Sequence, residues 1–342
     1  MTVGKAAPGP GCMWHEPTPS FVPHPLFAGP HRQTIAGAYL WRRPADSGVR
    51  RWVELDDGDR LVVHDDRGEG WRPGDRAVLL VHGLAGSHSS GYMLRAARKL
   101  NQVGCRTFRL DLRGCGAGMM TARRPLHAAR VDDIVAAVRQ VAQWTSDSPL
   151  TLVGFSLGAS MVLKLLGNVR ALPESIHSAI AVCPPLDILA CSRKLREGWN
   201  RIYDASFVRA LRRQLKLRRE RVPGFVDADW TSPPSSLYDF DRLYTAPNGG
   251  FAGVEDYYQQ ASSLPQLSRI SVPTRILFSE DDPLVPSDVF RRAEYSPTTR
   301  VYPTRYGGHL GFLARPAANS PDPDWHWLDW RIVDWVTKPD SP

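Results

Sequence analysis

A serine stands between two glycines in the stretch LTLVGFSLGAS, residues 150–160. The apolar run from Leu150 to Phe155 predicts a buried strand. Apolar residues then recur at helical spacing: Ala159, Val162, Leu163 and Leu166. A sharp strand-to-helix turn needs small residues because its backbone passes close to its neighbours, and Gly154 and Gly158 meet that need. The pattern predicts that Ser156 sits at this corner with its hydroxyl exposed, which is the position of a nucleophile.

A serine hydroxyl becomes a strong nucleophile only when a base takes its proton and an acid orients that base. The stretch RILFSEDDPLV predicts a strand from Arg275 to Phe278 that ends in acidic residues, and YGGHLGF places His309 in a loop. We predict that His309 is the base. Asp282 is the favoured acid because it stands directly before a proline where the chain leaves the strand, with Asp281 as the second choice and Asp187 as the third.

Two backbone N–H groups are placed to stabilise the oxyanion that forms when a serine attacks a carbonyl. The first is that of Leu157, at the start of the helix that follows the serine. The second is that of Leu84, which follows the predicted strand Val78–Val81 in AVLLVHGLAGS. His82 lies at the end of that strand, and we expect it to hold the loop by hydrogen bonds rather than to transfer protons.

A strongly basic segment lies between residues 193 and 221, where eleven Lys or Arg stand against three acidic residues. This excess equals the net charge of the whole chain, +8, so the rest of the chain is balanced. An apolar stripe runs beside the basic residues: Phe207, Val208, Leu211 and Leu215. Two interpretations stay open, a helix that packs its stripe on the core or an interfacial helix on anionic lipid. No recognised nucleic-acid-binding module accompanies the segment, so no nucleic-acid partner is expected.

The composition of the 342 residues, 42% hydrophobic and 23% charged, is typical of a globular protein. The five cysteines are scattered and show no metal-ligand spacing: Cys12, Cys105, Cys115, Cys183 and Cys191. We therefore expect no metal and a reducing compartment. Residues 1–30 hold seven prolines and lack the apolar core of a signal peptide, and no apolar run is long enough to cross a bilayer. The expected location is the cytoplasm, with peripheral membrane contact if the interfacial interpretation holds.

The residues that carry this chemistry need a fold that brings them together. Apolar and polar residues alternate on both sides of the Asp57-Gly58 turn in RWVELDDGDRLVVH, which predicts two strands in an antiparallel hairpin. Beyond it, strand and helix patterns alternate, which predicts a mostly parallel central sheet flanked by helices on both faces. Predicted helices cover about 90–103 and about 131–144, and DWHWLDWRIVDWV predicts a final helix.

The interval between the strand near Cys183 and the next strand near residue 275 is roughly 90 residues, whereas a crossover unit needs about 30. The surplus predicts an inserted helical cap. We expect three parts: residues 1–50 as an irregular Pro/Gly-rich segment packed on the core, residues 51–185 and 263–342 as the core, and residues 186–262 as the cap.

Several stretches together resemble the YheT-like branch of the α/β hydrolases, the AB-hydrolase-4 group: PHRQT, HGLAGSHSSGYM, LDLRGCGAG, GFSLGAS, YTAPNGGFAGVEDYYQQASS, DDPLVP and YGGHLGF. They span residues 30–313. The resemblance implies the α/β hydrolase fold, with the nucleophile on Ser156, the acid on Asp282 and the base on His309. The sequence departs from the branch at Ala159, where glycine is common.

The resemblance further implies a serine hydrolase that cleaves carboxylic esters, including lipid or medium-chain esters, without a cofactor. Acyl transfer from acyl-CoA to an alcohol is the alternative, since it differs only in the second nucleophile. A non-catalytic ligand or membrane binder with the same fold is a third interpretation. The expected partner is a small acyl ester, and the sequence predicts no oligomeric state. Cys115 in RGCGAG fits a turn residue better than a second nucleophile.

Overall fold

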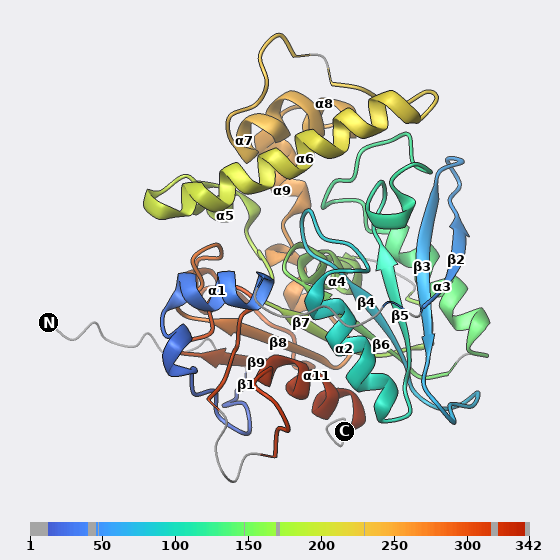
Figure 1. Cartoon of the computed structure of the whole chain (residues 1–342), viewed down its shortest axis with the longest axis vertical. Helices are drawn as coiled ribbons and strands as arrows, with labels where there is room; N and C mark the ends of the chain where they lie inside the picture. Colours follow the sequence, from blue (N-terminus) through green and yellow to red (C-terminus); the bar gives the residue numbers. More distant parts are fainter. Residues whose placement is uncertain are drawn as a thin grey trace, which may run out of the picture.

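A computed structural model describes residues 13–39, 46, 48–146, 148–168, 172–228, 230–315 and 321–338 of the chain (Figure 1). Within these ranges nine strands form one sheet in the order β1-β9-β8-β7-β6-β4-β5-β3-β2. Their bounds are β1 Met13–Trp14, β2 Val49–Glu54, β3 Arg60–Arg67, β4 Ala77–Val81, β5 Arg106–Asp111, β6 Leu150–Phe155, β7 Ile176–Val182, β8 Thr274–Ser279 and β9 Thr299–Thr304.

In this spatial order, all neighbouring strands from β1 to β5 are parallel. The strand β3 is antiparallel to both of its neighbours, β5 and β2. Every residue of β4 and β6 is buried, as expected of central parallel strands covered on both faces. In their register, Val81 of β4 lies opposite Gly154 of β6. The predicted mostly parallel sheet and the antiparallel hairpin are both confirmed.

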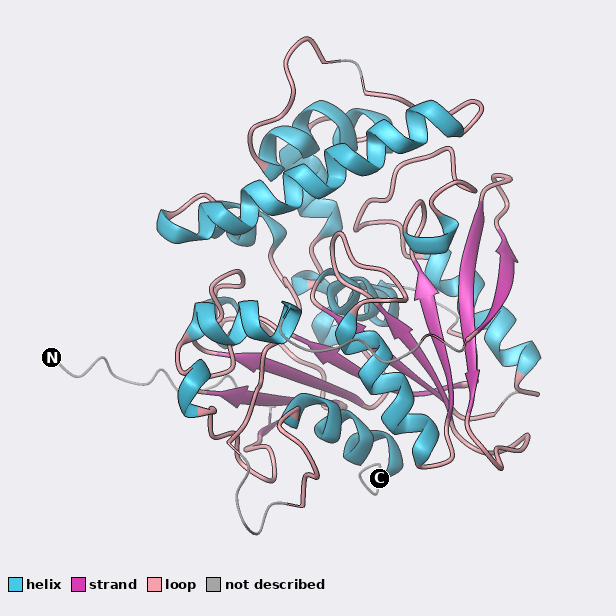
Figure 2. Ribbon diagram, in the orientation of Figure 1, coloured by secondary structure: helices cyan, strands magenta, loops and turns pink. Residues whose placement is uncertain are grey.

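Helices cover both faces of the sheet (Figure 2). On one face lie α2 Gly91–Gln102 and α11 Trp327–Thr337, whose Met93 and Ile332 share one apolar cluster. On the other lie α3 Asp132–Trp144 and α4 Leu157–Asn168, whose Ile134 and Val162 share a second cluster. The short elements η2 Gly116–Gly118 and α10 Asp288–Arg291 lie in the connecting loops. This layered core supports the strand ends from which the candidate catalytic residues emerge.

The N-terminal segment is not irregular throughout, so the prediction for residues 1–50 is wrong in part. It contains η1 Pro25–Phe27 and the ten-residue helix α1 Pro30–Tyr39. The buried face of α1 consists of polar and small residues: Gln33, Thr34, Ala36 and Gly37. Because that face is not apolar, no hydrophobic period marks the helix in the sequence. Residues 1–12, 40–45 and 47 of the predicted segment, Cys12 among them, lie outside the described residues.

The stretch between β7 and β8 is helical. It holds α5 Ile188–Leu195, η3 Gly198–Asn200, α6 Arg201–Arg221, α7 Leu237–Phe240, the π-helical turn η4 Asp241–Thr245, α8 Ala246–Gly249, α9 Val254–Ala261 and η5 Leu264–Arg269. Figures 1 and 2 show most of these helices gathered at one end of the molecule, above the sheet in this view, with the long helix α6 crossing in front of the others. We refer to this stretch as the cap.

The apolar stripe of α6 faces inward. Val208 and Leu215 are each 4% exposed, and Phe207 and Leu211 pack against the apolar clusters. The stripe is therefore used within the protein, as the first of the two interpretations predicts. Of the helices in the described ranges, none combines the length and apolar character needed to cross a membrane.

Candidate active site

Ser156 occupies the turn between β6 and α4, and its φ of +51° lies in the left-handed region that non-glycine residues rarely adopt. Space at the corner is tight. A Cβ on Gly154 would collide with the Cα of Ala159, and one on Gly158 would collide with the carbonyl oxygen of His82. Glycine is required on both sides of the serine because backbone atoms of nearby residues already occupy the space that a side chain at either position would need.

Ser156, His309 and Asp282 are joined in series by hydrogen bonds. The Oγ of Ser156 lies 2.8 Å from Nε2 of His309, and Nδ1 of His309 lies 2.7 Å from Oδ2 of Asp282. A carboxylate at Nδ1 accepts the proton there, which leaves Nε2 as the acceptor for the serine hydroxyl. The other oxygen of Asp282 accepts the N–H groups of Leu284 at 2.7 Å and Val285 at 3.0 Å. This arrangement is suited to activate Ser156.

The two other candidate acids have different positions. Asp281 accepts the backbone N–H of Gly308 at 2.9 Å and also pairs with the hydroxyl of Ser279. Asp187 caps helix α5 by accepting the N–H of Ala190 at 2.9 Å. Asp281 therefore shapes the loop that precedes the histidine, and Asp187 starts a cap helix.

Helix α1 holds the loop that carries His309, a role that our sequence analysis missed. The Oγ of Thr34 accepts the backbone N–H of His309 at 2.9 Å and donates to the carbonyl of Pro30 at 2.7 Å. The amide of Gln33 donates to the carbonyl of Leu313 at 3.0 Å and accepts its N–H at 2.8 Å. Both side chains belong to the PHRQT motif, but a threonine and a glutamine have no chemistry of their own that indicates a distant loop.

Lys194 and Cys183 lie beside the acid, and no sequence pattern marked either role. The Nζ of Lys194, on α5 of the cap, donates to the carbonyl of Asp282 at 2.7 Å and to that of Val285 at 3.2 Å. Burial, reinforced by the charge of Asp282, raises the pKa of the Cys183 thiol well above its usual value. Lys194 thus links the cap to the loop that carries Asp282, while Cys183 stays a protonated neighbour of the Asp282 carboxylate.

A mostly apolar cavity between core and cap contains the serine and the histidine. Leu84 and Leu157, the two predicted oxyanion donors, line it beside Ser156 and His309. Cap residues complete the wall: Ile188, Cys191, Ser192, Leu195, Phe207, Leu237, Asp241 and Tyr258. We call it the catalytic cavity.

His82 holds the loop of Leu84 with both ring nitrogens. Its Nε2 accepts the N–H of Leu112 at 3.1 Å, so its Nδ1 carries the proton that goes to the carbonyl of Gly83, 2.7 Å away. Burial lowers the pKa of His82, which keeps the ring neutral. The hydroxyl of Tyr92 accepts the N–H of Gly83 at 3.0 Å and fixes the same loop.

Asp241, which our sequence analysis did not single out, brings a buried carboxyl to the cavity wall. It begins the π-helical turn η4, and its Oδ2 accepts the hydroxyl of Tyr258 at 2.9 Å. Burial raises its pKa to about 7. This carboxyl therefore changes its charge near neutral pH.

Comparison with known proteins identifies the family of the chain. A family model described as the alpha/beta hydrolase fold matches residues 76–316. The putative esterase YheT of Escherichia coli (strain K12) is 29% identical over 93% of this chain and 93% of its own length. The medium-chain fatty acid ethyl ester synthase/esterase 2 of Saccharomyces cerevisiae is 28% identical over 77% of this chain and 62% of its own. The solved structure of Est1E from Butyrivibrio proteoclasticus matches with a TM-score of 0.55 at 16% identity, covering 85% of this chain and 98% of that one. The YheT resemblance and the fold predicted from the motifs are confirmed.

Proposed function

Because the chain belongs to the α/β hydrolase fold family, we propose that it is a serine hydrolase that cleaves carboxylic esters through an acyl-enzyme on Ser156. The observation that carries this proposal is the unbroken series of hydrogen bonds from Ser156 through His309 to Asp282. A non-catalytic binder has no need of a complete nucleophile, base and orienting acid, so this series favours an enzyme.

In the proposed reaction, His309 takes the proton of the Ser156 hydroxyl as its oxygen attacks the ester carbonyl. Asp282 stabilises the imidazolium, and the N–H groups of Leu84 and Leu157 stabilise the oxyanion. His309 then gives the proton to the departing alcohol. A water molecule, deprotonated by the same imidazole, then attacks the acyl-enzyme. The bond to Ser156 breaks, the acid is released and His309 returns the proton to the serine oxygen.

We extend the proposal to lipid or medium-chain acyl esters. The catalytic cavity is bounded by apolar side chains of the cap, among them Leu195, Phe207 and Leu237, which suit an alkyl chain. The name of the yeast relative refers to medium-chain fatty acid ethyl esters, which supports the same substrate class.

Labelling with a fluorophosphonate probe tests the nucleophile. We expect the wild type to label and both Ser156→Ala and His309→Ala to lose labelling. Ser192→Ala is the matched control because this serine lines the same cavity without a place in the hydrogen-bond series, and it should label like the wild type. Labelling of Ser156→Ala at the wild-type rate would reject the assignment.

Acyl transfer to an alcohol is the alternative, since it shares the acyl-enzyme. A panel of p-nitrophenyl esters of rising acyl length, run with and without ethanol, separates the two reactions. A hydrolase releases mainly free acid in both conditions. Ethyl ester as the main product would replace the hydrolase by an acyltransferase, and acyl-CoA with ethanol would then be the next substrate pair.

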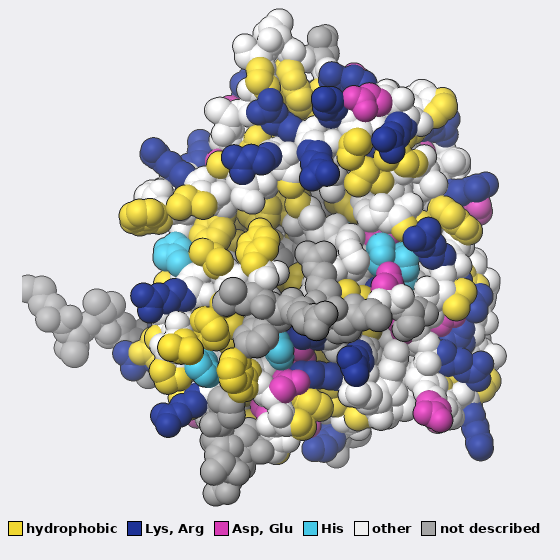
Figure 3. All heavy atoms as spheres, in the orientation of Figure 1, with side chains coloured by type: hydrophobic (Ala, Val, Ile, Leu, Met, Phe, Trp, Pro, Cys, Tyr) yellow, Lys and Arg dark blue, Asp and Glu magenta, His cyan; other side chains and the backbone are white. Residues whose placement is uncertain are grey.

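We also propose a cytoplasmic location with peripheral contact between residues 193–221 and anionic membranes, made by the exposed basic side chains of this segment rather than by its inward-facing apolar stripe. Figure 3 shows Lys and Arg side chains gathered over the cap. An open groove on α6 is lined mainly by basic side chains, with one acidic and three apolar residues: Arg209, Arg212, Arg213, Lys216, Arg219, Glu220, Leu215, Trp230 and Pro233. Trp199 and Ile202, at the start of this region, are 77% and 59% exposed. Exposed aromatic and basic side chains together suit the surface of an anionic bilayer.

Co-sedimentation with vesicles tests this contact. The wild type should sediment with phosphatidylglycerol vesicles and much less with phosphatidylcholine vesicles. Reversing the charge of Arg212, Arg213 and Lys216 to glutamate should abolish the difference. Equal sedimentation of the reversed protein and the wild type would refute the contact.

A further inference from the structure

A second cavity under the cap lies next to the catalytic cavity. Residues that line both are Leu84, Leu157, Ile188, Leu237 and Asp241. Because Leu84 and Leu157 also flank Ser156 in the catalytic cavity, an ester that reacts at Ser156 has space for its remote end in this second volume. We call it the distal cavity.

Arg218 of α6 forms part of the wall of the distal cavity. Its side chain is buried, with 4% of the residue exposed. Its Nη2 donates to the carbonyl oxygens of Ala122 at 2.8 Å and Arg124 at 2.9 Å, and its guanidinium lies 4.6 Å from the ring centre of Phe225. These contacts hold the guanidinium at the boundary between cap and core.

The charge of Arg218 has no carboxylate counterpart among the residues that the structure describes. Its Nε is buried and makes no hydrogen bond within that part of the chain. Five other buried arginines each pair with a carboxylate: Arg95, Arg106, Arg109, Arg113 and Arg331. The buried Arg275 donates to the carbonyl of Trp335 at 2.9 Å. Burial of a charge without a counter-charge is costly, so the guanidinium of Arg218 favours a counter-charge from another molecule.

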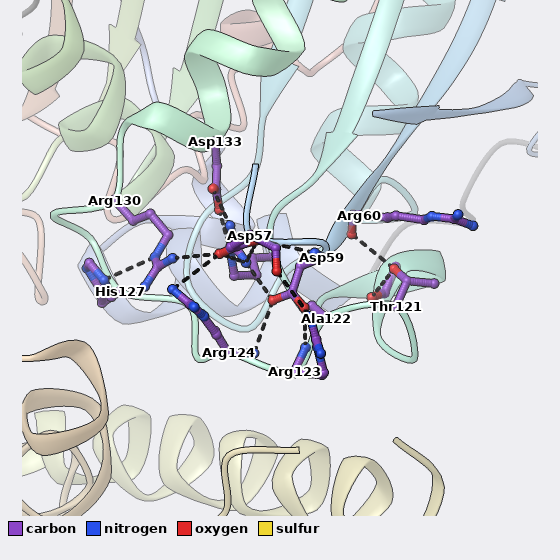
Figure 4. Close-up of polar contacts among 12 residues, drawn as sticks. Asp57, Asp59, Arg60, Thr121, Ala122, Arg123, Arg124, His127, Arg130 and Asp133 are labelled. Carbon is purple, nitrogen blue, oxygen red and sulfur yellow. Dashed lines mark hydrogen bonds and ion pairs between the residues drawn. The ribbon is translucent and has the colours of Figure 1, made fainter. Parts of the chain in front are cut away.

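Three acidic side chains near this wall are already paired with other arginines (Figure 4). The acids are Asp57, Asp59 and Asp133, and the arginines that pair with them are Arg113, Arg123, Arg124 and Arg130. Guanidiniums outnumber carboxylates in this network. It therefore adds positive potential beside Arg218. Within the described residues, neither its acids nor Asp241, whose carboxyl accepts the hydroxyl of Tyr258, forms an ion pair with Arg218.

His127 adds a hydrogen-bond donor to the same wall. The Nε of Arg130 donates to its Nε2 at 3.1 Å, so that nitrogen is the acceptor and Nδ1 carries the proton. Burial lowers the pKa of His127 to about 3, so the ring is neutral. Its buried Nδ1 has no hydrogen-bond partner in the described ranges.

We propose that the distal cavity binds an anionic group, a carboxylate or a phosphate, at the remote end of the ester substrate, and that Arg218 is the residue that recognises it. The inference rests on the proposed ester hydrolysis and specifies the substrate class. An anion there neutralises the unpaired guanidinium where water is excluded and charge-assisted hydrogen bonds are strong. A neutral ester of equal length gains nothing comparable.

Kinetics of the wild type on two sets of matched esters test the inference. In the first set, monomethyl esters of linear dicarboxylic acids of increasing length are compared with the dimethyl esters. In the second, monoacylglycerol phosphates are compared with monoacylglycerols of the same acyl chain. We expect the anionic member to have at least about a tenfold higher kcat/KM in one set, mainly through a lower KM, and that set identifies the anion. No preference for the anionic member in either set overturns the inference.

Variants of Arg218 assign the preference to this residue. Arg218→Gln should lower the ratio of kcat/KM between anionic and neutral members to about one, and Arg218→Lys should keep part of it. Arg219→Gln is the matched control because Arg219, next on the same helix, pairs with Asp227 at the surface, and its ratio should stay that of the wild type. A folded Arg218→Gln protein that keeps the wild-type ratio also overturns the inference. If this variant does not fold, the wild-type comparison decides alone.

The two proposals fail in different ways. Absence of hydrolysis of every ester, together with labelling that does not depend on Ser156, would reject the proposed function. Hydrolysis of neutral and anionic esters at equal rates would overturn only the assignment of the distal cavity.

Discussion

The hydroxyl oxygen of Thr34 accepts the backbone N–H of His309 at 2.9 Å and so joins residues 275 positions apart in the chain. Both groups are buried, with Thr34 and His309 each 8% exposed. The contact ties helix α1 to the loop of the proposed base. A segment far from the catalytic residues in sequence is thereby part of the structure that positions them.

We expect Thr34→Val to impair both stability and catalysis. Valine leaves the buried N–H of His309 without an acceptor, which costs about 1–3 kcal/mol in the free energy of unfolding. Displacement of the imidazole should lower kcat for p-nitrophenyl esters by about ten- to a hundredfold. Urea denaturation and steady-state kinetics measure the two effects. Thr34→Ser keeps the oxygen and should behave nearly as the wild type, and a Thr34→Val protein with unchanged kcat would contradict the positioning role.

Replacement of the neighbouring Asp282 and Asp281 by asparagine should lower kcat to very different extents. Asp282→Asn removes the carboxylate that accepts the Nδ1 proton of His309 and favours the wrong tautomer, so kcat should fall by about 10⁴-fold. Asp281→Asn keeps a carbonyl that can accept the N–H of Gly308, so its loss should be far smaller. Turnover of one ester at one pH compares them, and equal losses would show that the acid is wrongly assigned.

Asp241→Asn should stabilise the protein at alkaline pH. Burial raises the pKa of Asp241 from 3.8 to about 7, and the nearby charge of Asp204 acts in the same direction, while hydrogen bonds from Thr245 and Tyr258 oppose it. The folded protein therefore retains this proton at pH values where the unfolded chain has released it. The stability contributed by the group is full below about pH 4 and is lost as the pH rises to about 7. Asparagine stays neutral, so the gain should be on the order of 4 kcal/mol at pH 8 and small at pH 4.

Denaturant unfolding of the wild type and Asp241→Asn at both pH values measures this difference. The gain at pH 8 is the diagnostic result. Equal stability of the two proteins at pH 8 would mean that Asp241 ionises at its ordinary pKa in the folded state.

Cys105 and Cys115 should resist alkylation in the native protein. Burial raises the pKa of their thiols to about 11 and about 12, so almost no thiolate is present at pH 8. Iodoacetamide followed by mass spectrometry should modify them slowly in buffer and completely in urea. Rapid modification of native Cys115 with loss of ester hydrolysis would contradict its interpretation as a turn residue.

The most predictable parts of the molecule were those whose pattern is local. The period of apolar residues changes from strand to helix within the stretch that contains Ser156, so β6, the corner and α4 were predicted together. The sequence left three candidates for the acid that orients the histidine: Asp282, Asp281 and Asp187. Each follows a strand end, and only the fold decides which carboxylate faces the histidine. Strand β9 was missed since Pro303 interrupts its pattern, and pairing with β8 supplies its stability.

Elements that depend on tertiary contacts were not predictable in the same way. Helix α1 buries Gln33 and Thr34, and side chains of this kind indicate a buried face only when their partners are known. Arg218 and Arg219 are adjacent members of the same basic run, yet one is buried against the core and the other is exposed. The charge run predicted a basic helix but could not show which arginine turns inward, because that depends on the packing of the cap.

The bond between Thr34 and His309 also bears on biosynthesis. Since 275 positions separate Thr34 from His309, the helix that receives the histidine loop is translated well before the loop. Nascent or prematurely terminated polypeptides that lack it carry Ser156 without its activating partner. Reactivity of the serine would thus arise only once translation has passed the loop and the loop has docked on the helix.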